Sequence, residues 1–182
     1  MTQSIFEFEN MNISYINSLS VENAREAFTR CCGSERWVSG MLKELPFRDE
    51  SHLSQAAEQI WQTLRPKDWK EAFLHHPKIG EISALREKFA NMNAPDTSAW
   101  ASGEQSSVHE ASEEVLVKLA EGNALYEAKF GYIFIVCATG KSAAEMLAFL
   151  NERINNDAES ELRIAADEQH KITLLRLQKL GQ

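Results

Sequence analysis

A histidine pair followed by a proline, at residues 75–77, is the first feature of this sequence that could do acid–base chemistry. Pro77 disfavours helical geometry for the residue before it, so we expect His76 to lie in extended backbone just beyond a helix end. Its imidazole, which titrates near ~6.5 when unperturbed, can give or take a proton near neutral pH. The alternative is a turn that ends the helix, with His76 packed on Phe73 or Trp69. The dipeptide alone favours this structural interpretation.

An arginine inside an apolar helical segment is the second such feature. Arg176 lies in KITLLRLQKL, where Ile172 and Leu180 share its side of a helix. A partly buried guanidinium needs an anion. Its partner is either a carboxylate of the protein or an anionic ligand bound by both arms of the guanidinium. The residues alone leave both alternatives open.

A carboxylate next to an amide, Glu104-Gln105, is the third feature. The pair follows Trp100 in a segment rich in serine and glycine, before a long helical pattern. It can be a simple helix cap. It can also recognise amide and ureido groups, because glutamine offers both a donor and an acceptor.

Two partial motifs carry less weight. The stretch YIFIVCATGKSA has the order of a phosphate-binding loop, with Gly140-Lys141-Ser142 between a strand-like segment and a helix. The position that needs the opening glycine is Ile135, so we do not expect nucleotide binding. His109, Glu110 and Glu113 give H-E-x-x-E instead of the zinc pattern with two histidines, so we expect no metal site.

Composition narrows the class of protein. A chain of 182 residues with 43% hydrophobic residues predicts one domain, over residues 1–182. Its net charge of −8 argues against nucleic acid and anionic membranes as partners. No apolar run approaches the ~18–20 residues of a membrane span, and the first residues do not have the pattern of a signal peptide. Cys31, Cys32 and Cys137 are odd in number and two are adjacent, which predicts reduced thiols and a cytoplasmic protein.

The elements that must position these groups are predicted to be helices. Glycine and proline are scarce, with 8 and 4 residues. Ser20 and Ser142 are each expected to cap a helix. Helical spacing is found near residues 21–31, 37–45, 51–64, 69–73, 108–129, 143–154 and 158–179, and less clearly at 82–92. Residues 132–138, YIFIVCA, have the local propensity of a strand.

Together these features resemble the 2-oxo-4-hydroxy-4-carboxy-5-ureidoimidazoline (OHCU) decarboxylases of urate breakdown. The resemblance runs from Phe28 to Leu177, and the order and spacing of its motifs carry it. These motifs are Pro46-Phe47, His76-Pro77 through Gly80, Trp100 with Glu104-Gln105, YEAKFGYIF at 126–134, Glu161, Lys171-Ile172 and Leu175-Arg176-Leu177.

The resemblance implies an all-α, single-domain helical bundle, usually a homodimer. It replaces the strand expected at 132–138 with an extended connector or a helix start near the site. It also implies conversion of OHCU to (S)-allantoin and CO2 without a cofactor. His76 is implied as proton donor or acceptor, and Glu104 and Arg176 as polar partners of the substrate. The substrate-binding residues implied are Pro77, Ala101, Ser102, Gly103, Gln105, Phe134, Ile135, Val136, Cys137 and Ala138.

The residue types suit that chemistry, with one departure. The electron pair left by the departing carboxylate can enter the substrate's own ring imine, so no metal, pyridoxal or thiamine is required. Ala101 stands where many relatives carry a serine, and Ser102, a backbone donor or a water could replace that hydroxyl. His75 is an extra imidazole, expected to be exposed or to support His76. The alternatives are an inactive helical binding or interaction domain on the same scaffold, which Ala101 favours, and a protein that acts on another ureide.

Overall fold

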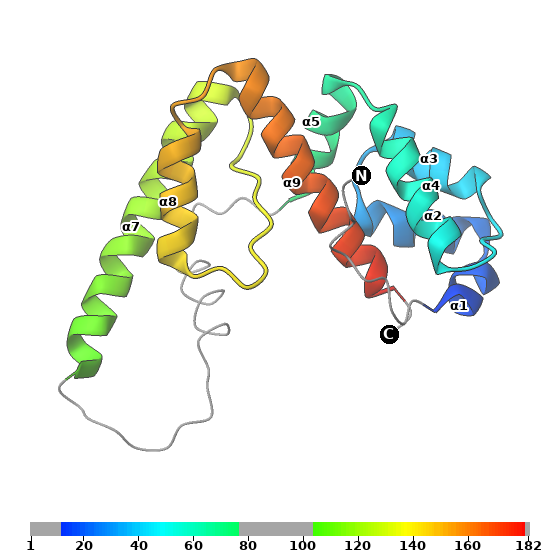
Figure 1. Ribbon diagram of the computed structural model, residues 1–182, viewed down its shortest axis with the longest axis horizontal. Coiled ribbons are helices and arrows are strands. Elements are labelled where there is room, and N and C mark those ends of the chain that lie inside the picture. The colour runs from blue at the N-terminus through cyan, green and yellow to red at the C-terminus, as the bar shows by residue number, and fades with distance from the viewer. Residues whose placement is uncertain (1–11, 77–103, 181–182) are drawn as a thin grey trace. The chain divides into compact units, whose positions relative to one another are not determined.

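The structure, a computed structural model, describes residues 12–76 and 104–180, with side chains from residue 113 onward in the second range (Figure 1). Over these residues all regular secondary structure is helical. The chain divides into two compact units. Unit 1 comprises Met1–His76 with Ala166–Gln182, and unit 2 comprises Pro77–Ala165. Each unit is described by itself below.

Unit 1 contains five helices from the N-terminal part of the chain and the C-terminal part of the last helix. The first helices begin at a polar side chain that accepts a hydrogen bond from a backbone N–H, as Ser20 does for α2. Asn12, Ser34 and Asp49 do the same for α1, α3 and α4. The helices are α1 (Ile13–Ser18), α2 (Val21–Cys31), α3 (Glu35–Lys43), α4 (Glu50–Gln62), α5 (Pro66–Leu74) and part of α9 (Ala158–Gln178).

Aromatic rings fill the core of unit 1. Phe28 packs edge-on against both Trp37 and Phe47, with ring centroids 6.2 Å apart in each pair. The indole N–H of Trp37 donates to the backbone oxygen of Ala57 at 3.2 Å, so this buried polar group is paired. These contacts fix α2, α3 and α4 against one another.

Unit 2 contains a long helix, α7 (Glu104–Phe130), a connector, α8 (Ala143–Arg153) and the start of α9. Helices α7 and α8 run alongside each other (Figure 1). Gly122 permits their close approach, because a Cβ at this position would lie 2.3 Å from Cδ2 of Leu150. The connector between α7 and α8 has no regular secondary structure at residues 133–138.

The all-α prediction is confirmed for the described residues. Ser20 and Ser142 cap α2 and α8 as predicted, and α7 and α9 lie within a few residues of their predicted bounds. The local strand propensity of residues 132–138 is not realised, so the connector that replaced it is the correct interpretation. Helix α1 is an element that the sequence pattern does not predict. The possible helix at 82–92 lies outside the described residues, and the single domain over 1–182 stays a prediction.

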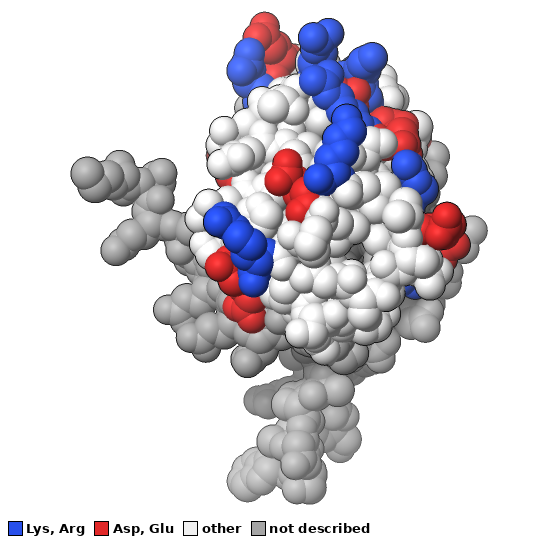
Figure 2. Space-filling model, turned by 90° about the vertical axis from the view of Figure 1, so that its right-hand side faces the viewer, with Lys and Arg blue, Asp and Glu red and all other residues white. Residues whose placement is uncertain are grey.

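The surface of unit 1 mixes charges of both signs. Figure 2 views the side of this unit on which α3 and α4 lie, and shows acidic and basic side chains among many uncharged ones. Exposed ion pairs such as Arg25–Glu35, at 2.6 Å, are of a kind that adds little to stability. In a search confined to the described residues, no helix combines the length and hydrophobicity that crossing a bilayer requires.

Candidate active site

His76 lies immediately beyond the end of α5. That helix begins with Pro66, which suits its first turn, and ends at Leu74. The backbone N–H of His76 donates to the oxygen of Phe73 at 3.2 Å, which tightens the last turn. The His76 side chain is partly buried. The predicted position of this imidazole, just past a helix end, is therefore confirmed, whereas the extended backbone expected for His76 stays a prediction.

A buried glutamine holds the His76 ring. Nε2 of His76 is 2.5 Å from Oε1 of Gln169, on α9, although the two residues are 93 positions apart. Gln169 is fully buried. Its side-chain nitrogen donates to Oγ1 of Thr173 at 3.2 Å, and the Thr173 hydroxyl donates to the backbone oxygen of Gln169 at 3.0 Å. The imidazole is thus tied to α9 by a polar chain.

The neighbouring His75 is exposed, and its ring packs against Gly33. A Cβ on Gly33 would lie 2.1 Å from Cγ of His75, so a larger residue would overlap the end of α5. This close approach joins the start of α3 to the segment that carries His76.

Arg176 is partly buried on α9, as predicted. Its Nη1 donates to the backbone oxygens of Arg30 and Cys31, at 3.2 Å and 3.4 Å, at the C-terminal end of α2. The negative end of a helix dipole is a favourable place for a cation. Among the described residues, no carboxylate pairs with Arg176 and no group accepts from its Nε or Nη2. Through these two atoms an arginine can donate two parallel hydrogen bonds to a carboxylate.

His76 and Arg176 are connected to the same face of α9. Gln169, Thr173 and Arg176 are spaced so that they form one stripe along the helix. Arg176 follows Gln169 by two turns, which is about 10 Å along the axis. Since Gln169 binds the His76 ring, this stripe brings an imidazole and a guanidinium into one region of unit 1.

Two cysteines lie beside this stripe without being reactive. Burial raises the pKa of Cys31 to about 12, although Arg176 nearby acts in the opposite direction. Burial also raises the pKa of Cys32 to about 11, against the effect of the Ser34 backbone and the nearby Thr173 hydroxyl. Both thiols are therefore protonated near neutral pH, and a protonated thiol is a poor nucleophile. Cys31, Cys32 and Cys137 form no disulfide.

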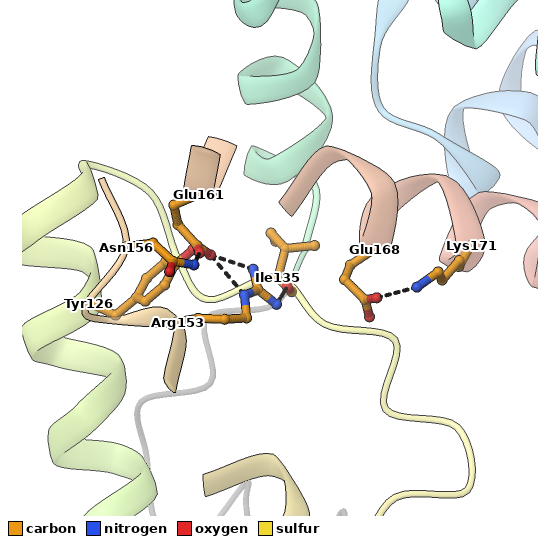
Figure 3. A network of polar contacts seen from close by, with 7 residues as sticks. All are labelled: Tyr126, Ile135, Arg153, Asn156, Glu161, Glu168 and Lys171. Carbon is orange, nitrogen blue, oxygen red and sulfur yellow. Dashed lines mark hydrogen bonds and ion pairs between the residues drawn. The ribbon is translucent and has the colours of Figure 1, made fainter. Parts of the chain in front are cut away.

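In unit 2 a buried carboxylate organises a network of polar contacts (Figure 3). Oε1 of Glu161, which has no exposed surface, accepts from Nε and Nη2 of Arg153 at 2.9 Å and 2.5 Å. It also accepts from the hydroxyl of Tyr126, and Oε2 accepts from Asn156 at 2.8 Å. Burial, together with the bond to Glu161, raises the pKa of Tyr126 far above its usual range, which keeps its proton on the phenol oxygen.

This network fixes the connector between α7 and α8. The remaining arm of Arg153, Nη1, donates to the backbone oxygen of Ile135 at 2.9 Å (Figure 3). The Arg153 guanidinium also lies 4.6 Å from the centroid of the Phe134 ring. Phe134, Ile135 and Cys137 are buried, whereas Val136 and Ala138 are partly buried. The buried ion pair thus anchors this connector at Phe134 and Ile135, within the residues 134–138 that the resemblance assigns to substrate binding.

The Gly140-Lys141-Ser142 segment has structural contacts. Nζ of Lys141 donates to the backbone oxygen of Cys137 at 2.7 Å. Ser142 forms a capping box with Glu145 at the start of α8. In the described part of the chain, no group of three or more His, Cys, Asp or Glu residues is placed to hold a metal ion.

The remaining predicted site residues lie where the structure describes little. Glu104 and Gln105 form the beginning of α7, close to the predicted helix start, but their side chains lie outside the described set. Pro77, Ala101, Ser102 and Gly103 lie outside the described residues. Their roles in the site stay predictions.

The sequence pattern does not identify the residues that position the predicted site residues. Gln169 and Arg153 are both buried and bonded to predicted site segments. One signal is present for Gln169: it lies with Thr173 and Arg176 on a polar stripe of a helix whose buried positions include Ala165, Ala166, Leu174 and Leu177. Nothing in the spacing of Arg153 and Glu161 identifies them as a buried pair.

Comparison with known proteins gives the same family throughout. The family model described as OHCU decarboxylase matches residues 17–178. The uric acid degradation bifunctional protein TTL of Arabidopsis thaliana is 37% identical over 165 residues, covering 89% of this chain. The chain spans only about half of that relative, 48% of its length. The 2-oxo-4-hydroxy-4-carboxy-5-ureidoimidazoline decarboxylase of Haloferax volcanii is 23% identical over 168 residues, which are 92% of this chain and 94% of the relative.

A solved structure is similar as well. A crystal structure of OHCU decarboxylase in the presence of (S)-allantoin matches with a TM-score of 0.65 and 38% identity. The match covers 86% of this chain and 96% of that one. The fold and the family model thus agree over most of the residues, and the chain belongs to the OHCU decarboxylase family.

Proposed function

We propose that this chain catalyses the cofactor-independent decarboxylation of OHCU to (S)-allantoin and CO2 in urate degradation, and is thus a carboxy-lyase. Family membership over residues 17–178 supports this reaction. The observation that carries it in this chain is the stripe of α9, where Arg176 keeps Nε and Nη2 uncommitted among the described residues near the glutamine that holds His76. These two groups suit a decarboxylation followed by a proton transfer, because an imidazole can transfer the proton and a guanidinium can bind the carboxylate.

Each group has a role in the proposed reaction. Arg176 binds the anionic substrate through Nε and Nη2 and orients the carboxylate that will leave. The bond to that carboxylate breaks, CO2 departs, and the electron pair enters the ring imine of the substrate. His76 then gives a proton to one face of the former imine carbon, which sets the handedness of the allantoin. The proton of the substrate's hydroxyl group moves to the ring nitrogen that took up the electron pair, and this leaves the carbonyl group of allantoin.

The other proposed site residues bind and orient the ureide. Glu104 accepts hydrogen bonds from ring or ureido N–H groups, and Gln105 pairs with the ureido group through its amide. Pro77, residues 101–103 and residues 134–138 are assigned to substrate binding, as the family resemblance implies. The Arg153–Glu161 pair supports this assignment, because it holds the backbone of the connector at Ile135.

We propose in addition that the protein is a cytoplasmic homodimer. The cysteines are buried and form no disulfide, which suits a reducing compartment. Light scattering after size-exclusion chromatography checks the dimer and should give twice the 20.6 kDa mass of one chain. A mass of one chain at micromolar concentration would refute it. No comparison favours an inactive binding domain, the alternative interpretation of the sequence.

The activity is tested by generating the unstable substrate in place. Urate is converted by urate oxidase and the following hydrolase, and the optical activity of the allantoin formed is recorded with and without this chain. We expect faster appearance of allantoin in one enantiomeric form. Allantoin that forms at the same rate with and without the chain, as a racemate, would refute the proposal.

A further inference from the structure

The contact between Gln169 and His76 specifies which ring nitrogen carries a proton. Nε2 of His76 lies 2.5 Å from Oε1 of Gln169, and an amide oxygen only accepts hydrogen bonds. Nε2 is therefore the donor and must be protonated, provided that the oxygen end of the amide faces the ring. A second contact, on the other side of the amide, settles which end that is.

The Thr173 hydroxyl determines that orientation. Its single proton is donated to the backbone oxygen of Gln169 at 3.0 Å, so towards the Gln169 side chain Oγ1 can only accept. A proton turned towards the neighbouring Cys32 would leave Oγ1 an acceptor in the same way. The group 3.2 Å from Oγ1 must then be the amide nitrogen, as it is here. The amide oxygen consequently faces His76.

We infer that Gln169 is a positioning residue that holds His76 as the Nε2–H tautomer, so that the ring exchanges its proton with the substrate through Nδ1. The exchange with substrate rests on the proposed function, whereas the tautomer does not. When the imidazolium gives its Nδ1 proton to the substrate carbon, the electron pair of that carbon forms the new C–H bond. The electrons of the N–H bond stay on Nδ1. The ring that remains is the neutral Nε2–H form, and its bond to Gln169 is unchanged.

A neutral partner suits this role better than a carboxylate would. A carboxylate next to Nε2 would stabilise the imidazolium and oppose loss of its proton. An amide fixes the ring in the same direction without adding a charge. The other tautomer would place two acceptors against each other beside the fully buried Gln169, which should disfavour it by roughly 5- to 150-fold.

The tautomer is measured directly by NMR on the chain labelled with ¹⁵N-histidine. Long-range ¹H–¹⁵N correlations distinguish the protonated ring nitrogen from the bare one, at a pH where titration shows the ring to be neutral. The spectrum of His76→Asn assigns the signals of His76 among those of the other histidines. We expect Nε2 to carry the proton in the unmodified chain. A predominant Nδ1–H form would overturn the inference.

Two pairs of variants separate positioning from packing. Gln169→Leu removes the acceptor and should give a mixture of tautomers, whereas Gln169→Glu keeps an acceptor and should retain Nε2–H. Thr173→Val releases the amide, whereas Thr173→Ser keeps the hydroxyl that orients it. The Thr173 pair decides the question if Gln169→Leu does not fold. A tautomer that is the same in every folded variant would overturn the role of Gln169.

Activity provides an independent readout. Gln169→Leu should lower kcat about 10- to 100-fold, because the His76 ring that transfers the proton loses its fixed orientation. KM should change less than about threefold. Equal kcat in the Leu variant and the unmodified chain would overturn the inference. If the unmodified chain has no decarboxylase activity, the proposed function fails while the tautomer prediction stands. If it is active and carries the Nδ1–H form, only this inference fails.

Discussion

At the scale of single residues, Arg176 is held by two backbone oxygens, and no described group accepts a hydrogen bond from its Nε or Nη2. We predict that Arg176→Lys lowers kcat/KM about 100-fold or more, because an ammonium cannot hold a carboxylate with two parallel bonds. The stability should change by less than about 1 kcal/mol, since the two contacts that Arg176 makes, 3.2 Å and 3.4 Å, are long.

A matched control lies on the same helix. Arg163 is exposed and pairs with Glu159 at 2.9 Å, so Arg163→Lys should leave kcat/KM unchanged. Steady-state kinetics with freshly generated OHCU compare the two variants. Equal kinetics for both arginine variants would show that Arg176 does not bind the substrate.

The buried thiols give a prediction about pH. The pKa of Cys31 is about 12 and that of Cys32 about 11 in the folded chain, above the ordinary value of 9.0. Below pH 9 both thiols are protonated in the folded and unfolded states, so their contribution to stability is complete. Above it the unfolded chain loses these protons first. The free energy of unfolding should therefore fall by up to about 1.4 kcal/mol per pH unit for each thiol, from about pH 9 to about pH 11 for Cys32 and to about pH 12 for Cys31.

Urea unfolding across that range checks this result. The double variant Cys31→Ala, Cys32→Ala should lose stability less steeply with rising pH than the unmodified chain. Parallel curves for the two proteins would contradict the assignment of raised pKa values to these thiols.

At the scale of elements, the buried Arg153–Glu161 pair holds the connector of unit 2. The Arg153 side chain is 8% exposed and that of Glu161 is 0% exposed, so water cannot replace the partner of either one. Glu161→Gln should lower the free energy of unfolding by about 3–5 kcal/mol, because it leaves a buried guanidinium without its counter-charge. Urea unfolding of the variant and the unmodified chain measures this loss.

Glu159 supplies the matched control, two residues earlier on α9. Its pair with Arg163, at 2.9 Å, is exposed, so Glu159→Gln should cost less than about 0.5 kcal/mol. The same urea unfolding experiment gives the comparison. Similar losses for Glu161→Gln and Glu159→Gln would show that the buried pair does not hold unit 2 together.

The elements show what can be predicted from local sequence. Ser20 and Ser142 are recognisable as caps because a hydroxyl before an amphipathic run satisfies free backbone N–H groups, and both cap their helices. Local propensity is wrong about a strand at residues 132–138, because β-branched and aromatic residues favour any buried, extended path. In this chain the backbone oxygen of Ile135 bonds to the side chain of Arg153.

At the scale of the whole molecule, the contacts that define the site join residues far apart in the sequence. His76 and Gln169 are 93 positions apart, and Arg176 and Arg30 are 146 apart. The spacing of apolar residues along the chain does not indicate such long-range contacts. The sequence therefore identifies His76 and Arg176 only through their residue types, their neighbours and the family resemblance. Helix α9 carries both contacts, which explains why one stripe of one helix organises this part of unit 1.

The most direct test of a shared site is the handedness of the allantoin made from freshly generated OHCU by the unmodified chain, His76→Asn and Arg176→Gln. We predict rapid formation of (S)-allantoin by the unmodified chain. Both variants should give slow formation of racemic allantoin, at the rate seen without protein. Either variant retaining the rate and handedness of the unmodified chain would contradict a site in which His76 and Arg176 act on the same ureide.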